Sequence, residues 1–379
     1  MRIGFDAKRL YNNFTGLGNY SRFVVEALSK FYPENDYLLF TPTARVNSDT
    51  QFFLNTKNIQ TILPPSWIST MKLNSFWRSF LISDIASRKN LNVYHGLSHE
   101  LPRGISGKMK TVVTVHDLIF LRYPQFYKSI DVAIYKAKIR YACRVADHIV
   151  AISEQTKRDI IEFLRIPSEK ISVIYQGCHA NFLKSYNAIE LDQIRLKYGL
   201  PTEYILNVGT IEPRKNALLI VKALKILKDR INIPLVIIGR PTKYLEEIKA
   251  YAKQHDLERR VLYIQVDFND LPAIYRLSKI FVYPSFFEGF GIPLVEAIAC
   301  EVPVITSTGS CFSEAAGPNS IYVDPMDDEA LALELFELLT HDHKRKKMVE
   351  QSTDFITKFA PKVISGHLFQ LYASLINTA

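Results

Sequence analysis

The sequence predicts an α/β protein of two domains, each built on a parallel β-sheet. A length of 379 residues fits roughly two domains. Along the chain, short apolar runs that end in glycine or polar residues alternate with amphipathic stretches, which is typical of buried parallel strands followed by helices. A polar, weakly periodic stretch up to about Leu200 interrupts this order. We therefore expect an N-terminal α/β domain over 1–182, joined by a C-terminal helix over 361–379, and a second α/β domain over 183–360.

Composition indicates a globular protein with a substantial core, since 47% of residues are hydrophobic and 22% are charged. No apolar run approaches the roughly 20 residues of a membrane span. The segment Met1–Asp6 begins a strand at once and does not resemble a secretory signal. The cysteines have no metal-binding or C-x-x-C spacing, so we interpret them as reduced thiols of a cytoplasmic protein. They are Cys143, Cys178, Cys300 and Cys311.

The positive charge is concentrated in the first half of the chain. Residues 1–180 hold 24 Lys and Arg against 14 Asp and Glu, a net charge of +10. The other 199 residues hold 23 and 24, a net charge of −1. This excess suggests that the first half meets an anionic partner. A phosphorylated acceptor, an acidic lipid surface and nucleic acid would all fit, but no nucleic-acid-binding motif is present and we do not expect that partner.

The first domain begins with a strand at 2–6 and a loop at 7–15, after which Gly16-Leu-Gly18 opens an amphipathic helix. Gly-x-Gly after a first strand is a weak dinucleotide signal, because the third glycine is missing and the loop is long. No acid ends the next predicted strand, at 37–41. We interpret Gly16 and Gly18 as backbone contacts for a phosphate or sugar.

Residues 64–90 differ from the rest of the domain. They contain both tryptophans, Trp67 and Trp77, with Arg88 and Lys89 close behind. Aromatic and basic residues interleaved on a predicted helix are typical of a helix that lies in a membrane interface. The alternative is a helix packed on its own domain with its cations extended over the surface. An anionic membrane surface is therefore a candidate partner.

Polar side chains follow two further predicted strands of this domain. The run Asn92–Gly96 contains His95, and Thr111–Val115 is followed directly by His116 and Asp117. Ligands of open parallel sheets bind at the carboxyl ends of the strands. His116 is therefore a candidate functional residue, although a histidine in a buried region is often structural. His95 is a weaker candidate at the same edge.

In the second domain, two cations lie in the loop between a predicted strand and the helix that follows it. The predicted strand Tyr204–Val208 runs into Gly209-Thr-Ile-Glu-Pro-Arg214-Lys215-Asn, and a helix follows at about 217–229. Fixed cations beside the free N–H groups of a helix start suit a diphosphate. A solvated charge pair is the alternative.

A second strand of this domain, Ile280–Tyr283, leads into Glu288-Gly-Phe-Gly291-Ile-Pro-Leu-Val-Glu296. Glycines allow the backbone to approach a ligand closely, and a helix N-terminus favours anions. Glu288 could hold sugar hydroxyls and Glu296 a ribose diol. Taken alone, the motif is as consistent with an ordinary β–α turn. The chain contains no Asp-x-Asp, which argues against a Mg²⁺- or Mn²⁺-chelated diphosphate.

Taken together, these motifs resemble those of the retaining glycosyltransferases of family 4, which have the GT-B fold of two facing Rossmann-like domains with a cleft between them. The motif Gly-Thr-Ile-Glu-Pro-Arg-Lys-Asn is most similar to the corresponding motif of the bacterial mannosyltransferase-like subgroup, which builds O-antigen and capsule. The residues that carry the resemblance are Gly16-x-Gly18, His116-Asp117, Ile152-Ser153-Glu154, Val208–Asn216, Glu288–Glu296 and Pro303–Thr306.

The resemblance implies a role for each matching residue. Arg214 and Lys215 would bind the donor diphosphate, Glu288 would hold hydroxyls of the donor sugar, and His116 would line the sugar pocket. The implied donor-binding positions are Glu296 on the ribose diol, backbone groups at Gly16, Gly18, Gly209, Phe290 and Gly291, and Gly239 and Val266 near the nucleobase.

The activity implied is retaining transfer of a hexose from a nucleotide sugar to a lipid-linked or polysaccharide acceptor in cell-surface glycan synthesis. Mannose from GDP-mannose is the best single expectation, with no metal or other cofactor. The enzyme would be cytoplasmic and peripheral on the inner face of the plasma membrane. Two alternatives remain open: another GT-B enzyme, such as a sugar-nucleotide epimerase or a phosphorylase, and a non-catalytic sugar-nucleotide-binding subunit.

Overall fold

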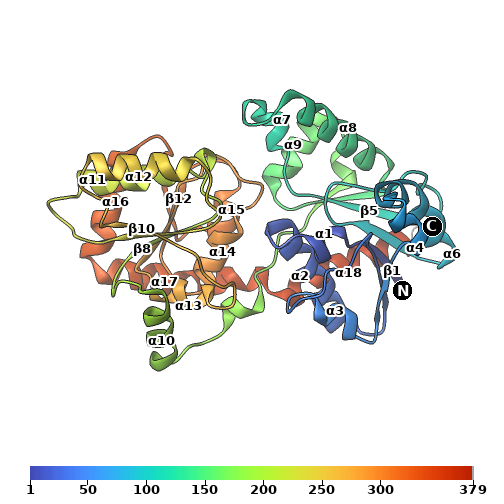
Figure 1. The fold of residues 1–379 in the computed structure, drawn as a ribbon, viewed down its shortest axis with the longest axis horizontal. Coiled ribbons are helices and arrows are strands. Elements are labelled where there is room, and N and C mark those ends of the chain that lie inside the picture. The colour runs from blue at the N-terminus through green and yellow to red at the C-terminus, as the bar shows by residue number, and fades with distance from the viewer. Residues whose placement is uncertain (378–379) are drawn as a thin grey trace. The chain divides into compact units, whose positions relative to one another are not determined.

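The structure is a computed structural model that describes residues 1–377, and it divides into two compact units (Figure 1). The first unit is Met1–Gly177 together with the chain from Ala360, and the second is Cys178–Phe359. The expected boundary lay at 182/183, five residues later. The C-terminal helix α18 (Pro361–Asn377) belongs to the first unit, and residues 378–379 of the expected terminal helix lie outside the described residues.

The sheet of the first unit is parallel throughout, in the order β3-β2-β1-β4-β5-β6-β7. The strand order reverses between β1 and β4, so this sheet has a topological switch point there. The strands are β1 (Arg2–Asp6), β2 (Asp36–Phe40), β3 (Ile59–Ile62), β4 (Val93–Gly96), β5 (Lys110–Val115), β6 (His148–Ala151) and β7 (Ile171–Val173).

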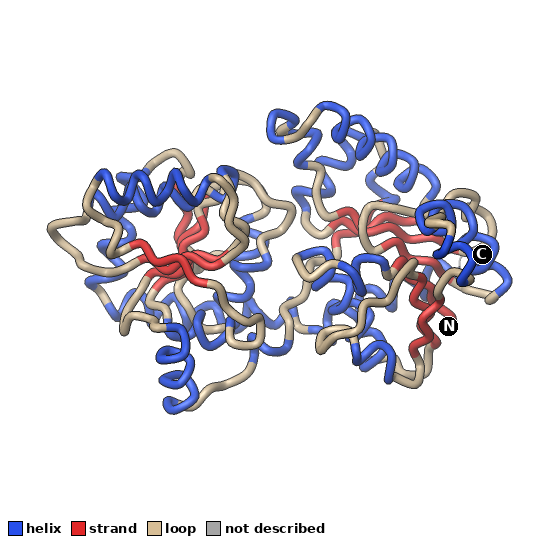
Figure 2. Tube along the Cα trace, viewed as in Figure 1, coloured by secondary structure: helices blue, strands red, loops and turns tan. Residues whose placement is uncertain are grey.

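Helices cover both faces of this sheet, as Figure 2 shows, and a separate apolar core fills each side. On one side α18 packs beside α2, where the rings of Tyr32 and Phe369 stack with centroids 4.0 Å apart. The helices are α1 (Lys8–Asn12), α2 (Gly16–Phe31), α3 (Gln51–Asn55), α4 (Ser66–Thr70), α5 (Asn74–Phe76), α6 (Ile82–Arg88), α7 (Ile119–Arg122), α8 (Ser129–Val145) and α9 (Glu154–Leu164), with short 3₁₀ turns η2 (Pro124–Phe126) and η3 (Ser168–Lys170).

The second unit repeats this architecture with a six-stranded parallel sheet in the order β10-β9-β8-β11-β12-β13. Its order reverses between β8 and β11, and the residues of both strands are buried, as expected for strands covered on both faces. The strands are β8 (Ile205–Val208), β9 (Leu235–Ile238), β10 (Val261–Ile264), β11 (Ile280–Tyr283), β12 (Val304–Ser307) and β13 (Ile321–Val323).

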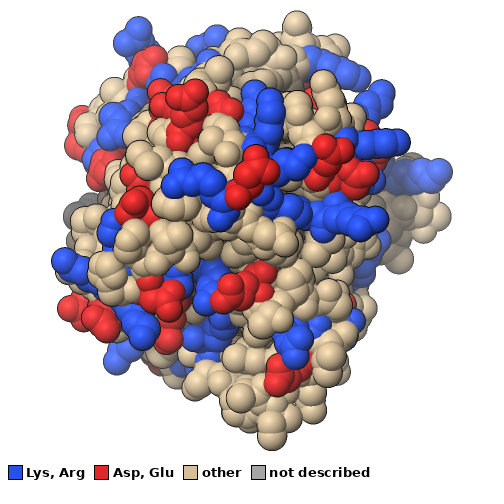
Figure 3. Space-filling model, turned by 90° about the vertical axis from the view of Figure 1, so that its left-hand side faces the viewer, with Lys and Arg blue, Asp and Glu red and all other residues tan. Residues whose placement is uncertain are grey.

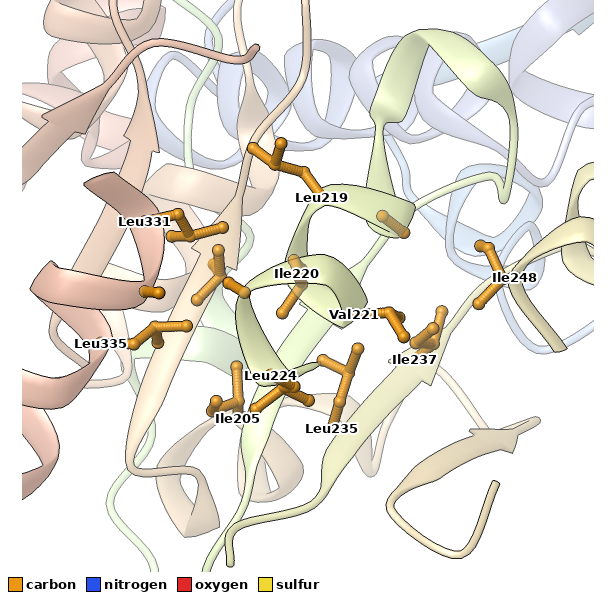
Figure 4. Packing of buried hydrophobic residues seen from close by; sticks show 14 of the residues in the cluster. Ile205, Leu219, Ile220, Val221, Leu224, Leu235, Ile237, Ile248, Leu331 and Leu335 are labelled. Atoms are coloured by element: carbon orange, nitrogen blue, oxygen red, sulfur yellow. The ribbon is translucent and has the colours of Figure 1, made fainter. Parts of the chain in front are cut away.

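The core of this unit forms where α11 lies over the sheet and against α16 (Figure 4). Ile220 and Leu224 of α11 point toward Leu235 of β9 and Leu335 of α16, because residues four apart share one face of a helix. The helices are α10 (Ala188–Tyr198), α11 (Ala217–Ile226), α12 (Tyr244–Gln254), α13 (Leu271–Leu277), α14 (Ile292–Ala299), α15 (Phe312–Ala316), α16 (Asp328–Thr340) and α17 (Asp342–Ile356), with 3₁₀ turns η4 (Ala180–Leu183), η5 (Pro213–Lys215) and η6 (Thr357–Phe359).

Residues 64–90 do not form the single interfacial helix that the sequence suggested. They comprise α4, α5, the π-helical turn η1 (Trp77–Leu81) and α6. Trp77 is fully buried in the core of its own unit, whereas 57% of Trp67 is exposed. Over residues 1–377, no helix has both the length and the apolar character needed to span a membrane.

Two other segments also differ from the prediction. The expected loop at 7–15 contains α1, and the polar stretch before Leu200 contains α10. No residue of α10 is buried, so the segment lacks the apolar periodicity by which helices are recognised. A capping box between Asn187 and Glu190 and a left-handed Gly199 after the last turn bound it instead.

Candidate functional site

The candidate site is built on the loops that follow β8 and β11, the adjacent strands at the switch point of the second unit. The loop after β8 carries Arg214 and Lys215 on η5, and the loop after β11 carries Glu288. The backbone joins the two loops, because the Phe286 N–H donates to the Arg214 carbonyl oxygen at 2.9 Å. Strand order therefore brings Glu288 to a pair of cations that precede it by more than 70 residues in the sequence.

Glu288 is the centre of this cluster. Its Oε1 lies 2.8 Å from Arg214 Nη1 and 2.7 Å from Lys215 Nζ. The hydroxyls of Tyr283 and Ser285 donate to the same oxygen at 3.0 and 2.7 Å. The other oxygen, Oε2, has no hydrogen-bond partner within residues 1–377, and the carboxyl side chain keeps 10% exposure. One oxygen anchors the group and the second is available to an external hydroxyl.

The two cations retain unused donors. Arg214 donates from Nη1 to the Phe287 carbonyl oxygen at 2.5 Å, and its Nη2 pairs with Glu212 at 2.6 Å. The Lys215 ammonium donates to the Tyr283 hydroxyl and contacts Glu288, which leaves one of its three N–H groups. Both side chains are about 15% exposed, at 16% and 15%. The site can therefore offer N–H groups to an anion without breaking its internal contacts.

The electrostatics of the cluster keep Glu288 and Arg214 charged. Burial alone would raise the pKa of Glu288, but Lys215 and Arg214 lower it to about 2. Burial works against the charge of Arg214, yet Glu288 and Glu212 together raise its pKa above the usual value. Burial and the neighbouring Glu288 raise the pKa of Tyr283 well above 10, so this residue remains a neutral hydroxyl that can donate.

The motif around Glu288 is also held from the following loop. The Glu288 N–H lies 3.2 Å from Ser310 Oγ, which lies 3.0 Å from the Glu288 carbonyl oxygen. The Cys311 thiol contacts the carbonyl oxygens of Glu288 and Phe290 at 3.2 and 3.0 Å. Gly291 has a φ of 100°, a conformation that other residues rarely adopt, and starts α14 without a side-chain cap. The glycine turn thus presents the N-terminus of α14 next to the cluster.

Glu296 lies on α14, one to two turns beyond this N-terminus. It is half-buried and accepts a hydrogen bond from the Tyr275 hydroxyl at 3.1 Å. Burial raises its pKa to about 7, against the smaller effect of the Tyr275 hydrogen bond. Glu296 therefore changes its charge near neutral pH, whereas Glu288 does not.

Three further predicted positions follow strands of the same sheet. Gly209, after β8, has a φ of 150° and lies beside Lys215 and Tyr283. Gly239, after β9, packs on Gly209, and a Cβ there would lie 1.8 Å from the Gly209 carbonyl oxygen. This close backbone contact explains Gly239 without any ligand. Val266 is half-buried in the loop after β10, the edge strand.

His116 belongs to the first unit, where it follows β5. The side chain is 4% exposed, its Nε2–H donates to the Leu97 carbonyl oxygen at 2.8 Å, and its Nδ1 accepts from the Gln176 amide at 3.0 Å. Burial and the neighbouring His99 lower its pKa to about 3, so the ring is neutral. Both ring nitrogens are engaged within the unit. His95 is likewise buried, between Tyr372 and Thr114.

Gly16 and Gly18 also lie in the first unit, at the start of α2. A Cβ on Gly18 would lie 1.6 Å from the Asn13 carbonyl oxygen, whereas a Cβ on Gly16 would meet nothing within 4 Å. Gly18 is therefore required by the packing of α2 on the preceding segment. Only Gly16 of the pair has open space beside it.

Sequence reasoning missed the side chains that hold Glu288 and the cations in place. Tyr283 ends β11, Glu212 lies two residues before Arg214, and Ser310 follows β12. A polar residue at the end of a buried strand could have pointed to Tyr283 and Ser285. Contacts across loops, such as that of Ser310, depend on register and could not be read from spacing.

Charge is mixed on one face of the molecule. On the face drawn in Figure 3, Lys and Arg are interspersed with Asp and Glu. The net charge of −1 counted for residues 181–379 agrees with this pattern.

Comparison with known proteins shows the family of this chain. A model described as Glycosyltransferase Family 4 matches residues 16–182, and one described as Glycosyl transferases group 1 matches 192–355. The chain belongs to glycosyltransferase family 4. The two matched ranges take in most of the chain and fall one in each compact unit, apart from a few residues at the boundary.

Curated relatives of this family 4 chain include bacterial mannosyltransferases. The O-antigen chain mannosyltransferase B of Escherichia coli is 28% identical over 258 residues, 67% of each chain. The O-antigen chain mannosyltransferase RfbU of Salmonella typhimurium is 30% identical over 248 residues, 65% of this chain and 63% of the relative. The matches therefore span about two thirds of these relatives' own length.

Solved structures confirm the predicted GT-B fold. A glycosyltransferase from Rickettsia africae ESF-5 matches with a TM-score of 0.76 at 19% identity, covering 100% of this chain and 99% of that one. WaaG, a glycosyltransferase involved in lipopolysaccharide biosynthesis, matches with a TM-score of 0.72 at 15% identity, covering 98% and 99%. At these identities the likeness concerns the fold.

Proposed function

We propose that this chain is a retaining, metal-independent hexosyltransferase that uses a nucleotide sugar and acts on a lipid-linked or polysaccharide acceptor in cell-surface glycan synthesis. The observation that carries the proposal is the cluster of Arg214, Lys215 and Glu288 at the switch point of the second unit. The names of the bacterial relatives favour mannose as the sugar and GDP-mannose as the donor. The proposed location is the cytoplasmic face of the membrane.

The cluster suits departure of a nucleoside diphosphate. Negative charge builds up on the leaving diphosphate in the transition state, and pre-positioned cations stabilise it without reorganising at that moment. Arg214 is already fixed by three oxygen contacts, from Phe287, Glu212 and Glu288. We assign the charge-stabilising role to Arg214 and Lys215, which is why the proposal needs no metal ion. Unused N–H groups of both cations would donate to the phosphates.

The carboxylates would orient the donor. The available Oε2 of Glu288 would accept from hydroxyls of the hexose, since a low pKa keeps it an acceptor throughout the physiological range. Glu296 would accept from the ribose diol in its charged form. Glu288 is committed through Oε1 to four internal contacts, so we assign it positioning and no nucleophilic attack. Retention would then follow from attack on the face that the diphosphate leaves.

The test is a panel of nucleotide sugars incubated with the purified chain in EDTA, with donor hydrolysis and thermal stabilisation as readouts. We expect GDP-mannose or another hexose donor to be hydrolysed slowly and to raise the Tm. Anomeric NMR of a transferred product distinguishes retention from inversion. A chain that neither hydrolyses nor is stabilised by any donor would contradict the proposal. Conversion of one nucleotide sugar into its epimer without any acceptor would indicate an epimerase.

A further inference from the structure

The first unit contains a polar cavity of about 480 Å³ that is separate from the residues described above. Its walls come from segments that follow β1, β2 and β4, and from η1 and α8. Lys8 and Arg9 follow β1, Thr43 follows β2, and Glu100 and Arg103 follow β4. The cavity therefore opens at the carboxyl edge of the first sheet, beside its switch point between β1 and β4, where parallel sheets bind ligands.

The cavity contains an ion-pair network in which its carboxylates are already paired with cations. Arg78, with 14% of its side chain exposed, donates to Asp6 from Nε at 3.0 Å and from Nη2 at 2.5 Å, and also pairs with Glu100. Lys138 of α8 contacts Glu100 at 3.2 Å. These contacts outweigh the effect of burial on Glu100 and lower its pKa. Both carboxylates, Asp6 and Glu100, are therefore already paired.

Three further cations line the cavity without a carboxylate partner among residues 1–377. They are Lys8, Arg9 and Arg103. Arg103 is held by its guanidinium lying 4.1 Å from the centre of the Tyr141 ring. Burial and the positive charges of Arg78 and Arg9 lower the pKa of Lys8, as expected where cations are crowded. Five cations thus face two carboxylates, and the concave surface is short of negative charge.

An exposed aromatic strip begins at the wall of this cavity. Phe80 lines the cavity, is 52% exposed and stacks on Phe76 with centroids 5.1 Å apart. Phe76, Met71 and Trp67 are 49%, 63% and 57% exposed. We call the stacked pair of Phe76 and Phe80 the apolar strip. The π-helical turn η1 supplies both Arg78 and Phe80, and such turns are often found at functional sites.

We propose that this cavity binds the phosphate or diphosphate group of a lipid-linked acceptor, with its hydrocarbon chain along the apolar strip. Lys8, Arg9 and Arg103 would donate to phosphate oxygens, while the network around Arg78 keeps the walls in place. A soluble phosphate shares the headgroup chemistry, but it would leave the apolar strip without a use. The inference rests on the proposed function, because it assigns the acceptor of that reaction to a site in the first unit.

The experiment is calorimetric titration of the full chain with farnesyl diphosphate, inorganic diphosphate and farnesol. We expect farnesyl diphosphate to bind at least about tenfold more tightly than inorganic diphosphate, and farnesol to bind far more weakly than either. In the Lys8→Gln/Arg103→Gln double variant, affinity for both diphosphates should fall at least about tenfold, because charge-assisted hydrogen bonds are lost. The matched control is Lys57→Gln. Lys57 is exposed and precedes β3, so it lies at the amino ends of the strands, away from the carboxyl edge where the cavity opens.

Two more variants make the result decisive. Phe80→Ser should weaken the binding of farnesyl diphosphate and leave the binding of inorganic diphosphate unchanged. Arg103→Lys preserves the positive charge and should retain most of the affinity for both ligands. Equal binding of the two diphosphates by the unaltered chain would overturn the lipid assignment. Unchanged binding in the double variant would overturn the assignment of the diphosphate site to this cavity. Loss of binding in Arg214→Gln instead would overturn it as well.

The outcome is independent of the test of the proposed function. Donor hydrolysis needs no acceptor, so a chain that hydrolyses nucleotide sugars but fails these titrations keeps its function and loses this acceptor site. A chain that binds farnesyl diphosphate in the cavity but hydrolyses and binds no donor would retain the site and lose the function.

Discussion

Replacing Glu288 by Gln tests the charge arrangement of the second unit most sharply. The substitution preserves the size of the side chain but removes the negative charge that two cations share. Arg214 and Lys215 would then lie close together with only Glu212 to balance them. We expect lower stability, because two half-buried cations lose their common partner.

The size of the effect follows from the pKa of Glu288. It is lowered from 4.5 to about 2, and a shift of this size corresponds to about 3 kcal/mol in favour of the charged form. For a unit of this length that is roughly 6–12 °C in Tm. The contribution is complete above pH 4.5 and is lost as the pH falls toward about 2. The difference between variant and parent should therefore be full at pH 7 and small near pH 2.

Urea unfolding at pH 7 and pH 2.5 measures this difference directly. Glu301→Gln is the control, since that carboxylate is 69% exposed and its change should be within about 0.5 kcal/mol. Donor turnover should fall at least about 100-fold in the Glu288 variant, because the sugar loses its orienting acceptor. A variant as stable and as active as the parent would refute both the electrostatic reasoning and the positioning role.

Three further predictions concern single residues. Arg214→Ala should lower turnover by roughly 10²–10³ while donor binding changes less, as measured by the separate effects on kcat and KM; equal effects on both would contradict a role in the transition state. Donor affinity should fall as the pH drops below about 7, where Glu296 takes up a proton, and Glu296→Gln should abolish that dependence. Gly18→Ala should destabilise by several °C, with the matched Gly16→Ala near neutral, since only the former Cβ meets Asn13.

The order of the fold was largely predictable from the sequence because its parallel strands are buried on both faces and read as continuous apolar runs. The strands 2–6 and 280–283 were predicted with their observed bounds. The edge strand β3 was missed, since three of its four residues are only partly buried or exposed. The helix α10 was missed because none of its residues is buried.

The site was predictable where strand ends carry unusual residues. Arg214, Lys215 and Glu288 are predicted as parts of one site, and the structure brings these three side chains into direct contact. Their mutual pairing was not foreseen, because a basic pair before a helix and a carboxylate in a distant loop reveal no distance between them. Gly18 illustrates a different limit, since backbone packing against Asn13 already requires a glycine there, and its role at a ligand stays a prediction.

The central claim is that a donor diphosphate binds at the loops after β8 and β11. Hydrogen exchange with and without a saturating nucleoside diphosphate, measured by mass spectrometry, tests it most directly. We predict slower exchange in the segments 209–216 and 285–292 of the parent chain, and loss of that protection in Lys215→Gln. Protection confined to other segments, or none in these two while the ligand is demonstrably bound, would contradict the assignment.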